Sequence, residues 1–462
     1  MGSNSWREVK LSDLGEVARG RSRHRPRYAE HLYGGEYPFI QTGDIKASEG
    51  RISSHEQTYS EAGLAQSRLW PAGTMCITIA ANIAETGVLQ YPACFPDSVI
   101  GFIADKNKAD VYYIEYVFRK LRKDIQRQAT GSVQDNINLQ TFERLKFKVP
   151  HVEEQHRIAN FLNHFDKKIT LNRQINQTLE QMAQTLFKSW FVDFDPVVDN
   201  ALDAGFFEQD LAFSDELLRR VEVRKAVRES DNFKPLSEDI RRLFPNAFEE
   251  CTEPALGLGG WVPKGWNNGC ISDVAHYRTK RINTSELTLT NYISTENMLV
   301  DRKGIQKATA LPTVNSVPAY TSGTILISNI RPYFKKIWLA KGDGGYSNDV
   351  LGFEVKDQGT EEYLFNLMYQ DSFFDFMMAT SKGSKMPRGD KKAILGLELV
   401  VPPLKLRKLF SKNVNGFYTS SSIRNNENHA LGHLRDTLLP KLISGELSLS
   451  NIKIDIPEET LI

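Results

Sequence analysis

The chain has 462 residues and a formal net charge of +1, so its total charge argues neither for nor against a nucleic-acid partner. A composition of 40% hydrophobic and 25% charged residues is that of an ordinary soluble protein, and the length predicts several domains. The four cysteines form no CxxC pair, and no apolar run approaches the ~18 residues of a membrane helix. These features exclude a disulfide framework, a zinc site of that type and a membrane protein. With no signal peptide, we expect a reduced, cytoplasmic setting.

Residues 1–150 are predicted to form a mixed α/β domain. Short apolar runs separated by Gly, Pro and Asn turns are typical of strands. The predicted strands are 37–40, 74–79 and 98–103. A helix is predicted from Val111 to about Gln128, because apolar residues there recur at helical spacing.

A long helix is predicted at 151–192. Residues from Glu153 to about Trp190 include no Gly or Pro, and apolar residues recur at alternating steps of three and four. Residues 193–260 are predicted to be a partly helical linker. Its acidic start lacks Lys and Arg until Arg219, so it would repel DNA and is expected to face protein or solvent.

The second half of the chain repeats the first. Segments 6–13, 72–77, 97–102 and 145–150 recur in the same order as 266–273, 322–327, 348–353 and 397–402. The separation of roughly 250 to 260 residues is far beyond the period of about 20–50 residues in solenoid repeats. We therefore predict a second homologous domain at 261–402, a second long helix at 403–447 and a tail at 448–462.

The two long helices are predicted to pair, because each can cover the apolar stripe of the other. The seam residues are Leu162, Ile169, Asn176, Leu179 and Leu186 in the first helix, and Val414, Asn428, Leu431, Leu434 and Leu438 in the second. Asn176 and Asn428 would cost stability but fix the register. The alternative is two amphipathic helices, each packed separately on its own domain.

The sequence lacks several of the usual catalytic motifs. It has no GxxxxGK[ST] phosphate loop, no HExxH, no clustered His and Cys, and no N/D-P-P-Y/F segment for a flipped base. Asp97 with a short string such as Asp44 and Lys46 is a weak candidate for a nuclease site, since such strings arise by chance. The chain is therefore predicted to bind rather than to catalyse.

Three kinds of segment are candidates for DNA contact. The first is the arginine cluster Arg19, Arg21, Arg23, Arg25 and Arg27, which includes no acid and is answered in the second copy by Arg278, Lys280 and Arg281. The second is a polar loop with Ser132, Gln134 and Asn136 in one copy and Lys382, Ser384, Lys385 and Arg388 in the other. The third is Asn82, matched by Asn329 and Arg331 after the equivalent strand. Gln and Asn suit adenine edges, whereas Arg and Lys suit guanine or phosphate, so the copies would read different sequences. For each segment the alternative is an ordinary solvated loop.

The order of motifs resembles the specificity subunits of type I restriction–modification systems. The matching segments are 11–17 after Trp6, 148–150 followed by 153–159, 186–196 and 261–266. The second copy departs from the pattern, because Glu154 and Gln155 become Leu406 and Arg407. The partner contacts of Glu154 and Gln155 are therefore not expected to be duplicated.

The resemblance implies an α/β (α+β) fold in which two target recognition domains are separated by two long helices that form an antiparallel coiled coil, with a pseudo-twofold repeat. It implies that each domain reads half of a bipartite double-stranded DNA target, while the helices set the spacer and dock two adenine-N6 methyltransferase subunits. A restriction subunit would join through the complex. S-adenosylmethionine, ATP and Mg would belong to these partners, and this chain would bind no cofactor and catalyse nothing. The rival interpretations are a stand-alone endonuclease and a coiled-coil scaffold that binds no DNA, with a self-contained modification enzyme less favoured.

Overall fold

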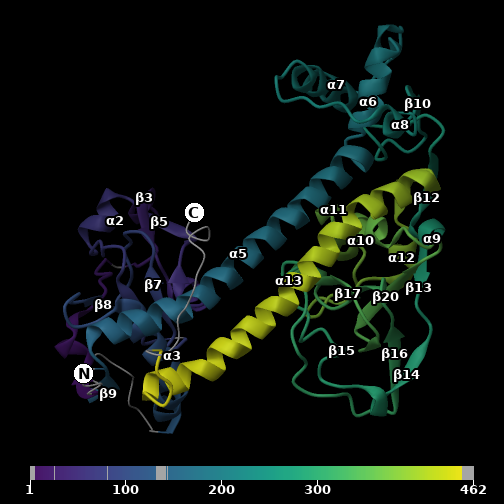
Figure 1. The fold of residues 1–462 in the computed structure, drawn as a ribbon. Coiled ribbons are helices and arrows are strands. Elements are labelled where there is room, and N and C mark those ends of the chain that lie inside the picture. The colour runs from purple at the N-terminus through teal and green to yellow at the C-terminus, as the bar shows by residue number, and fades with distance from the viewer. Residues whose placement is uncertain (1–5, 25, 81, 132–141, 143, 450–462) are drawn as a thin grey trace. The chain divides into compact units, whose positions relative to one another are not determined.

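The chain forms two compact units, Met1–Asn172 with Asn426–Ile462 and Arg173–Asn425 (Figure 1). The computed structural model describes residues 6–24, 26–80, 82–131, 142 and 144–449. Unit 1 holds the first globular domain, and unit 2 holds the second globular domain and the segment that precedes it. Within the described part of the chain, no helix combines the length and the apolar character that a membrane crossing requires.

A five-stranded sheet in the order β2-β8-β6-β7-β4 forms the centre of the first domain. Its strands are β2 (Gly15–Arg19), β4 (Arg51–Ile52), β6 (Met75–Thr78), β7 (Thr86–Leu89) and β8 (Val99–Ala104). Around it lie β1 (Arg7–Lys10), paired with β9 (Lys146–Val149), β3 (Tyr33–Phe39), paired with β5 (Gln57–Tyr59), and the helices α1 (Thr42–Ala47), α2 (Glu61–Ala65) and α3 (Val111–Gly131). Strands β6 and β7 are buried throughout, because α3 and the neighbouring segments cover the sheet.

The second domain repeats this sheet, with β13-β20-β17-β18 in the places of β2-β8-β6-β7. These strands are β13 (Ala275–Tyr277), β17 (Ile325–Ser328), β18 (Ile337–Leu339) and β20 (Val350–Val355). A second sheet contains β14 (Arg281–Asn283), β15 (Tyr292–Ile293), β16 (Ser316–Tyr320) and β19 (Gly344–Tyr346), while β12 (Asn267–Cys270) pairs with β21 (Glu398–Val401). The helices are α9 (Ile271–Val274), α10 (Glu361–Tyr369), α11 (Asp371–Ala379) and α12 (Lys391–Leu395). The shared strand order confirms the internal repeat.

The long helices are α5 (Val152–Phe191) and α13 (Leu404–Ser444). In each unit, the part of α5 that belongs to it lies antiparallel to the part of α13 that belongs to it. In unit 1, the Asn172 amide donates to Asn428 Oδ1 at 2.9 Å; in unit 2, the Asn176 amide donates to Asn425 Oδ1 at 2.9 Å. Leu162, Ile169 and Val414 are buried, whereas Leu179, Leu186, Leu431 and Leu438 are half-buried. The predicted fold class, including the pairing of the helices, is therefore confirmed.

Two details of the predicted helices are wrong. Leu434 is not in the seam, since it is 46% exposed, and its neighbour Arg435 turns inward to Asp166 on α5. Arg407 also takes over a contact that was not expected to be duplicated. Its Nε donates to the carbonyl of Pro402 at 3.1 Å, much as Gln155 Nε2 donates to the carbonyl of Pro150 at 3.0 Å.

The segment between the repeats is folded around a ladder of ion pairs. It contains α6 (Asp195–Asp203), α7 (Asp215–Arg228), α8 (Glu238–Arg241), β10 (Phe248–Glu250) and β11 (Trp261–Pro263). The paired residues are Asp195 with Arg220, Asp199 with Arg224 and Asp203 with Arg228, each pair 25 residues apart. Because the offset is constant, α6 and α7 run parallel. The acidic face of α6 therefore meets arginines of α7 and is not free to repel DNA.

A buried ionic cluster in unit 1 ties α3 to both long helices. Asp166 of α5 accepts hydrogen bonds from Tyr116 of α3 at 2.6 Å and from Arg435 of α13 at 2.5 Å, and Arg119 of α3 lies 3.4 Å away. Burial alone would raise the pKa of Asp166, but the charges of Arg119 and Arg435 outweigh it and hold that pKa below its ordinary value. The folded state thus favours the charged carboxylate.

Replacing Asp166 by Asn should lower the opening free energy of α3 by about 3–5 kcal/mol at pH 7, because it leaves buried guanidinium groups short of a counter-charge. Since the folded pKa is depressed, this stability is present above the unfolded pKa of about 3.9 and is lost as the pH falls through the folded value. The difference from wild type should therefore shrink below about pH 4. Hydrogen exchange of α3 peptides, followed by mass spectrometry, measures it.

The control is Asp124→Asn on the same helix, because Asp124 and its partner Arg127 are exposed and such surface pairs are worth at most about 1 kcal/mol. Equal protection of α3 in the Asp166→Asn variant and in wild type would contradict this account of the cluster.

Candidate nucleic-acid interface

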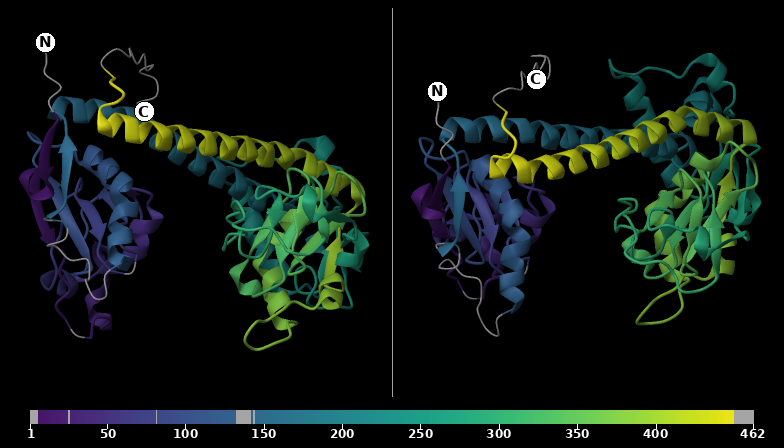
Figure 2. Two further views of the ribbon diagram at one scale, coloured as in Figure 1. Left: turned by 90° about the horizontal axis from the view of Figure 1, so that it is seen from below. Right: turned by 60° about the horizontal axis from the view of Figure 1, so that its bottom comes forward.

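Two of the predicted segments in the second domain form one surface. The amide of Arg331 donates to the carbonyl of Pro387 at 2.8 Å, and the amide of Gly389 donates to the carbonyl of Asn329 at 3.3 Å. Lys382 and Arg388 pair across the loop through both backbone hydrogen bonds, at 2.9 and 3.0 Å. Figure 2 shows this loop projecting from unit 2. We call Arg331, Tyr333, Lys382, Ser384, Lys385 and Arg388 the 331–388 surface.

The 331–388 surface carries four cations and is only partly neutralised. Lys382 Nζ lies 2.6 Å from Asp390 Oδ2, and this hydrogen bond raises the pKa of Lys382. Arg388 lies 3.1 Å from Asp349 Oδ1. The side chains of Arg331 and Lys385 are exposed and make no hydrogen bond or ion pair with any residue that the structure describes. These two charges are available to an anionic ligand.

A strained turn presents an aromatic ring beside these charges. The turn η5 (Pro332–Phe334) is flanked by Arg331 and Lys335, whose φ angles of 51° and 48° lie in the left-handed region that side chains rarely adopt. Tyr333 within it is 48% exposed. Strain of this kind persists where the surroundings enforce it, and it concentrates at ligand-contacting sites. The turn is therefore a candidate contact element.

A second strained segment and one carboxylate hold this turn. Asp301 and Arg302, also at positive φ, donate their amides to the carbonyls of Phe334 and Lys335 at 2.9 Å each. Asp371 at the start of α11 accepts from Arg302 and Lys335 at 2.5 and 2.6 Å. Hydrogen bonds from Arg302 and Lys335 lower the pKa of Asp371 to about 2, so it stays charged at neutral pH.

Two other predicted residues of the second domain are buried. The Arg278 side chain is 3% exposed, donates to the carbonyl of Ala319 at 2.7 Å and lies 2.9 Å from Glu354 Oε1. Asn329 is also buried, and its Oδ1 has no partner among the described residues. We therefore leave Arg278 and Asn329 out of the surface. Lys280 and Arg281 are exposed, although Arg281 also donates to Ser316.

In the first domain, the arginine cluster meets an acid from elsewhere in the chain. Arg19 Nε donates to the carbonyl of Asp97, and Arg27 Nη2 lies 2.9 Å from both carboxylate oxygens of Asp97. The acid that the cluster itself lacks is therefore supplied to Arg27 by Asp97. Arg21 and Arg23 are exposed, and within the described ranges their side chains make no hydrogen bond or ion pair. Asp97, a candidate for nuclease chemistry, is instead an ion-pair partner.

Of the remaining predicted residues of the first domain, the structure describes only Asn82. Arg25, Ser132, Gln134 and Asn136 lie outside the described residues. Asn82 Oδ1 accepts from Lys46 Nζ at 3.3 Å. Among the residues that the structure describes, no group of His, Cys, Asp and Glu side chains is arranged to hold a metal ion.

Comparison with known proteins identifies the first part of the chain. Residues 4–181 match the family of the type I restriction modification DNA specificity domain. The chain contains such a specificity domain. It is 26% identical to the type I restriction enzyme MjaIX specificity subunit of Methanocaldococcus jannaschii, covering 97% of this chain and 94% of the relative. It is also 26% identical to the HindI specificity subunit of Haemophilus influenzae, over 67% of this chain and 71% of the relative. The resemblance found in the sequence is thereby confirmed.

A solved structure shares the fold over almost the whole length. The S subunit of a type I restriction-modification system from M. genitalium superposes with a TM-score of 0.54, at 13% identity, covering 96% of this chain and 97% of that one. At this identity the likeness concerns the fold alone. It agrees with the specificity domain found in residues 4–181 and extends the architecture to the second half.

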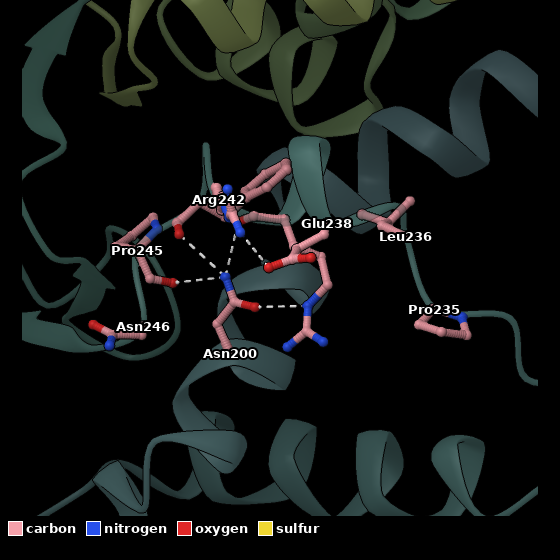
Figure 3. Close-up of a pocket in the computed structure, with 9 residues that line it drawn as sticks. Asn200, Pro235, Leu236, Glu238, Arg242, Pro245 and Asn246 are labelled. Atoms are coloured by element: carbon pink, nitrogen blue, oxygen red, sulfur yellow. Dashed lines mark hydrogen bonds and ion pairs between the residues drawn. The ribbon is translucent and has the colours of Figure 1, made fainter.

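A cavity outside the specificity domain provides no ligand site. It measures about 650 Å³ beside α6 and α8, with Asn200 at its centre (Figure 3). Asn200 Nδ2 donates to the carbonyls of Arg241 and Phe244 at 3.0 and 3.1 Å, and Asn200 Oδ1 accepts from Arg241 Nε at 3.0 Å. These groups satisfy one another, so we assign the cavity a structural role.

Two elements of the second domain were missed by sequence reasoning. Asp371 holds the turn that contains Tyr333 by binding Lys335 and Arg302, which lie 36 and 69 residues before it in the chain. No local sequence pattern joins these residues. The sequence signal available was Pro332 after Arg331, which favours a turn at that point.

Proposed function

We propose that this chain is the sequence-specific DNA-binding subunit of a type I restriction–modification complex. Each globular domain reads one half of a bipartite double-stranded target. The observation that carries the proposal is the pair of matched sheets bearing different exposed cations, Arg21 and Arg23 in one domain and Arg331 and Lys385 in the other. Arginine and lysine suit phosphates and guanine edges, and divergent loops on a shared frame suit two different half-sites.

The long helices set the spacer between the half-sites and dock two adenine-N6 methyltransferase subunits, and a restriction subunit joins through them. S-adenosylmethionine, ATP and Mg belong to those partners, and this chain is not catalytic. Both helices expose single large apolar side chains that a partner protein would cover. These are Leu171 and Met182 on α5, and Ile423 and Leu434 on α13. Among the polar residues of α5 that could contact a partner, Arg157, Lys168 and Lys188 form ion pairs within the chain, while His164 and Arg173 also make internal contacts.

The proposal is tested by co-purifying the chain with its methyltransferase subunit and selecting bound duplexes from a random library. Two short constant blocks around an unconstrained gap are the expected result. A stable complex that selects no motif would reduce the chain to a docking scaffold. Cutting of DNA by the chain alone with a divalent metal would favour an endonuclease instead.

Removing the unpaired cations should reduce the salt dependence of binding. The double variant Arg331→Ala/Lys385→Ala should lower the slope of log K against log salt by about 2, because each lost phosphate contact removes about 0.9. Arg21→Ala/Arg23→Ala should act likewise in the first domain. Fluorescence anisotropy of the complex on its selected duplex at several salt concentrations measures the slope.

Tyr333→Ala is the control for these charge variants. It removes an exposed ring and no charge, so the salt slope should stay as in wild type whatever the change in affinity. An unchanged slope in the Arg331→Ala/Lys385→Ala variant would remove the 331–388 surface from the phosphate contacts.

Lengthening both helices should change the preferred spacer. One heptad adds about 10.5 Å to an α-helix, which corresponds to about three base pairs of B-DNA at about 3.4 Å each. Inserting one heptad near the middle of α5 and one near the middle of α13 should therefore shift the selected gap while both constant blocks stay the same. Selection with the lengthened chain measures the gap, and an unchanged gap would show that the helices do not set it.

A further inference from the structure

The cluster around Asp166 joins four separate elements of unit 1. Arg51 on β4 lies 3.3 Å from Glu115 Oε2 of α3, and it donates to Asn163 Oδ1 of α5 at 3.2 Å. Glu115 is completely buried and also accepts from Arg119 at 2.6 Å. Arg435 of α13 completes the cluster at Asp166. An edge strand of the sheet, the domain helix and both long helices therefore meet in one set of charges, which we call the unit 1 joint.

The second domain has a joint at the equivalent place, but its chemistry is reversed. Tyr113 and Tyr363 are buried equivalents on the domain helices, and three residues further on lie Tyr116 and Asn366. On the long helices, Asp166 corresponds to Tyr418, at the same spacing as Pro150 and Pro402. In unit 1, Tyr116 Oη donates to Asp166 at 2.6 Å; in unit 2, Tyr418 Oη donates to Asn366 Oδ1 at 3.0 Å. The tyrosine therefore lies on the domain helix in unit 1 and on the long helix in unit 2, but a hydrogen bond joins the domain helix to the long helix in both units.

A joint made of buried charges accepts few geometries. Planar guanidinium groups need matched carboxylates, and displacing either partner leaves an unpaired buried charge. Apolar packing between the same helices would tolerate small rotations at less cost, because the hydrophobic effect is not directional. The unit 1 joint therefore fixes the orientation of the first domain on the two long helices more tightly than its apolar core would.

We infer that the unit 1 joint, made by Arg51, Glu115, Tyr116, Arg119, Asp166 and Arg435, determines which spacer lengths the complex accepts. Its members are positioning residues that do not touch DNA. They act by holding the first recognition domain at one angle on the helices, so that both half-sites are bound together only at a matching separation. This inference rests on the proposed function.

The test uses the complex of the full chain with its methyltransferase subunit and duplexes that carry both selected blocks with gaps of varied length. In Tyr116→Phe and in Asp166→Asn, both blocks should still be selected. The preference for the optimal gap over gaps one base pair longer or shorter should fall, from about tenfold or more to about threefold or less.

Tyr113→Phe is the matched control, because the Tyr113 hydroxyl is buried on the same helix and has no partner among the described residues. It should leave the gap preference as in wild type. If Asp166→Asn does not assemble, Tyr116→Phe carries the test, since it removes one hydroxyl and keeps the ring. Unchanged gap preference in a folded Tyr116→Phe complex, or loss of the first block itself, overturns the inference and leaves the proposed function standing. Failure of the wild-type complex to select any split motif would overturn both.

Discussion

Each globular domain shares its apolar core with the long helices, and the remaining structure depends on this packing. In unit 1, Tyr113 and Val117 of α3 are buried in one cluster with Leu162 of α5 and Leu442 of α13. In unit 2, Tyr363 of α10 is buried in one cluster with Phe187 of α5 and Phe410 of α13, and the ring centroids of Tyr363 and Phe187 lie 5.8 Å apart. Burying each such side chain contributes about 1.5–3 kcal/mol. The domains are therefore built onto the helices, which makes the helices a frame for positioning them.

On this shared frame, polar chemistry has diverged in two ways that serve different ends. At the joints between domain and helix, hydrogen-bonding partners differ but a contact is kept, as Tyr116 with Asp166 and Asn366 with Tyr418 show. At the exposed loops of the second domain, some side chains have no internal partner among the described residues, so the fold does not constrain which residue stands there. Arg331 and Lys385 belong to this second kind. Under the proposed function, both kinds of divergence are needed to hold two recognition domains in place while each reads a different sequence.

Features with a local period were predictable from the sequence, whereas features formed by distant charges were not. The first long helix follows from apolar spacing uninterrupted by Gly or Pro, and the second helix and the duplicated sheet follow from the repeated segments. The prediction that Leu434 lies in the seam was wrong because its neighbour Arg435 binds Asp166 there. The ion-pair partners of Arg278 and Arg27 could not be predicted, because Glu354 and Asp97 lie 76 and 70 residues away from them. The ion-pair ladder between α6 and α7 could have been predicted from the sequence, since acids recur every four residues in α6 and arginines recur every four residues in α7.

The most direct test of the central claim is a hydroxyl-radical footprint of the assembled complex on a duplex carrying its selected target. Two domains that read separate half-sites should protect two short stretches of DNA backbone. Both stretches should coincide with the constant blocks that selection identifies. The Arg21→Ala/Arg23→Ala chain should weaken protection in one stretch, and the Arg331→Ala/Lys385→Ala chain in the other. A single continuous footprint that both variants weaken equally would contradict the account of two independent readers on one helical frame.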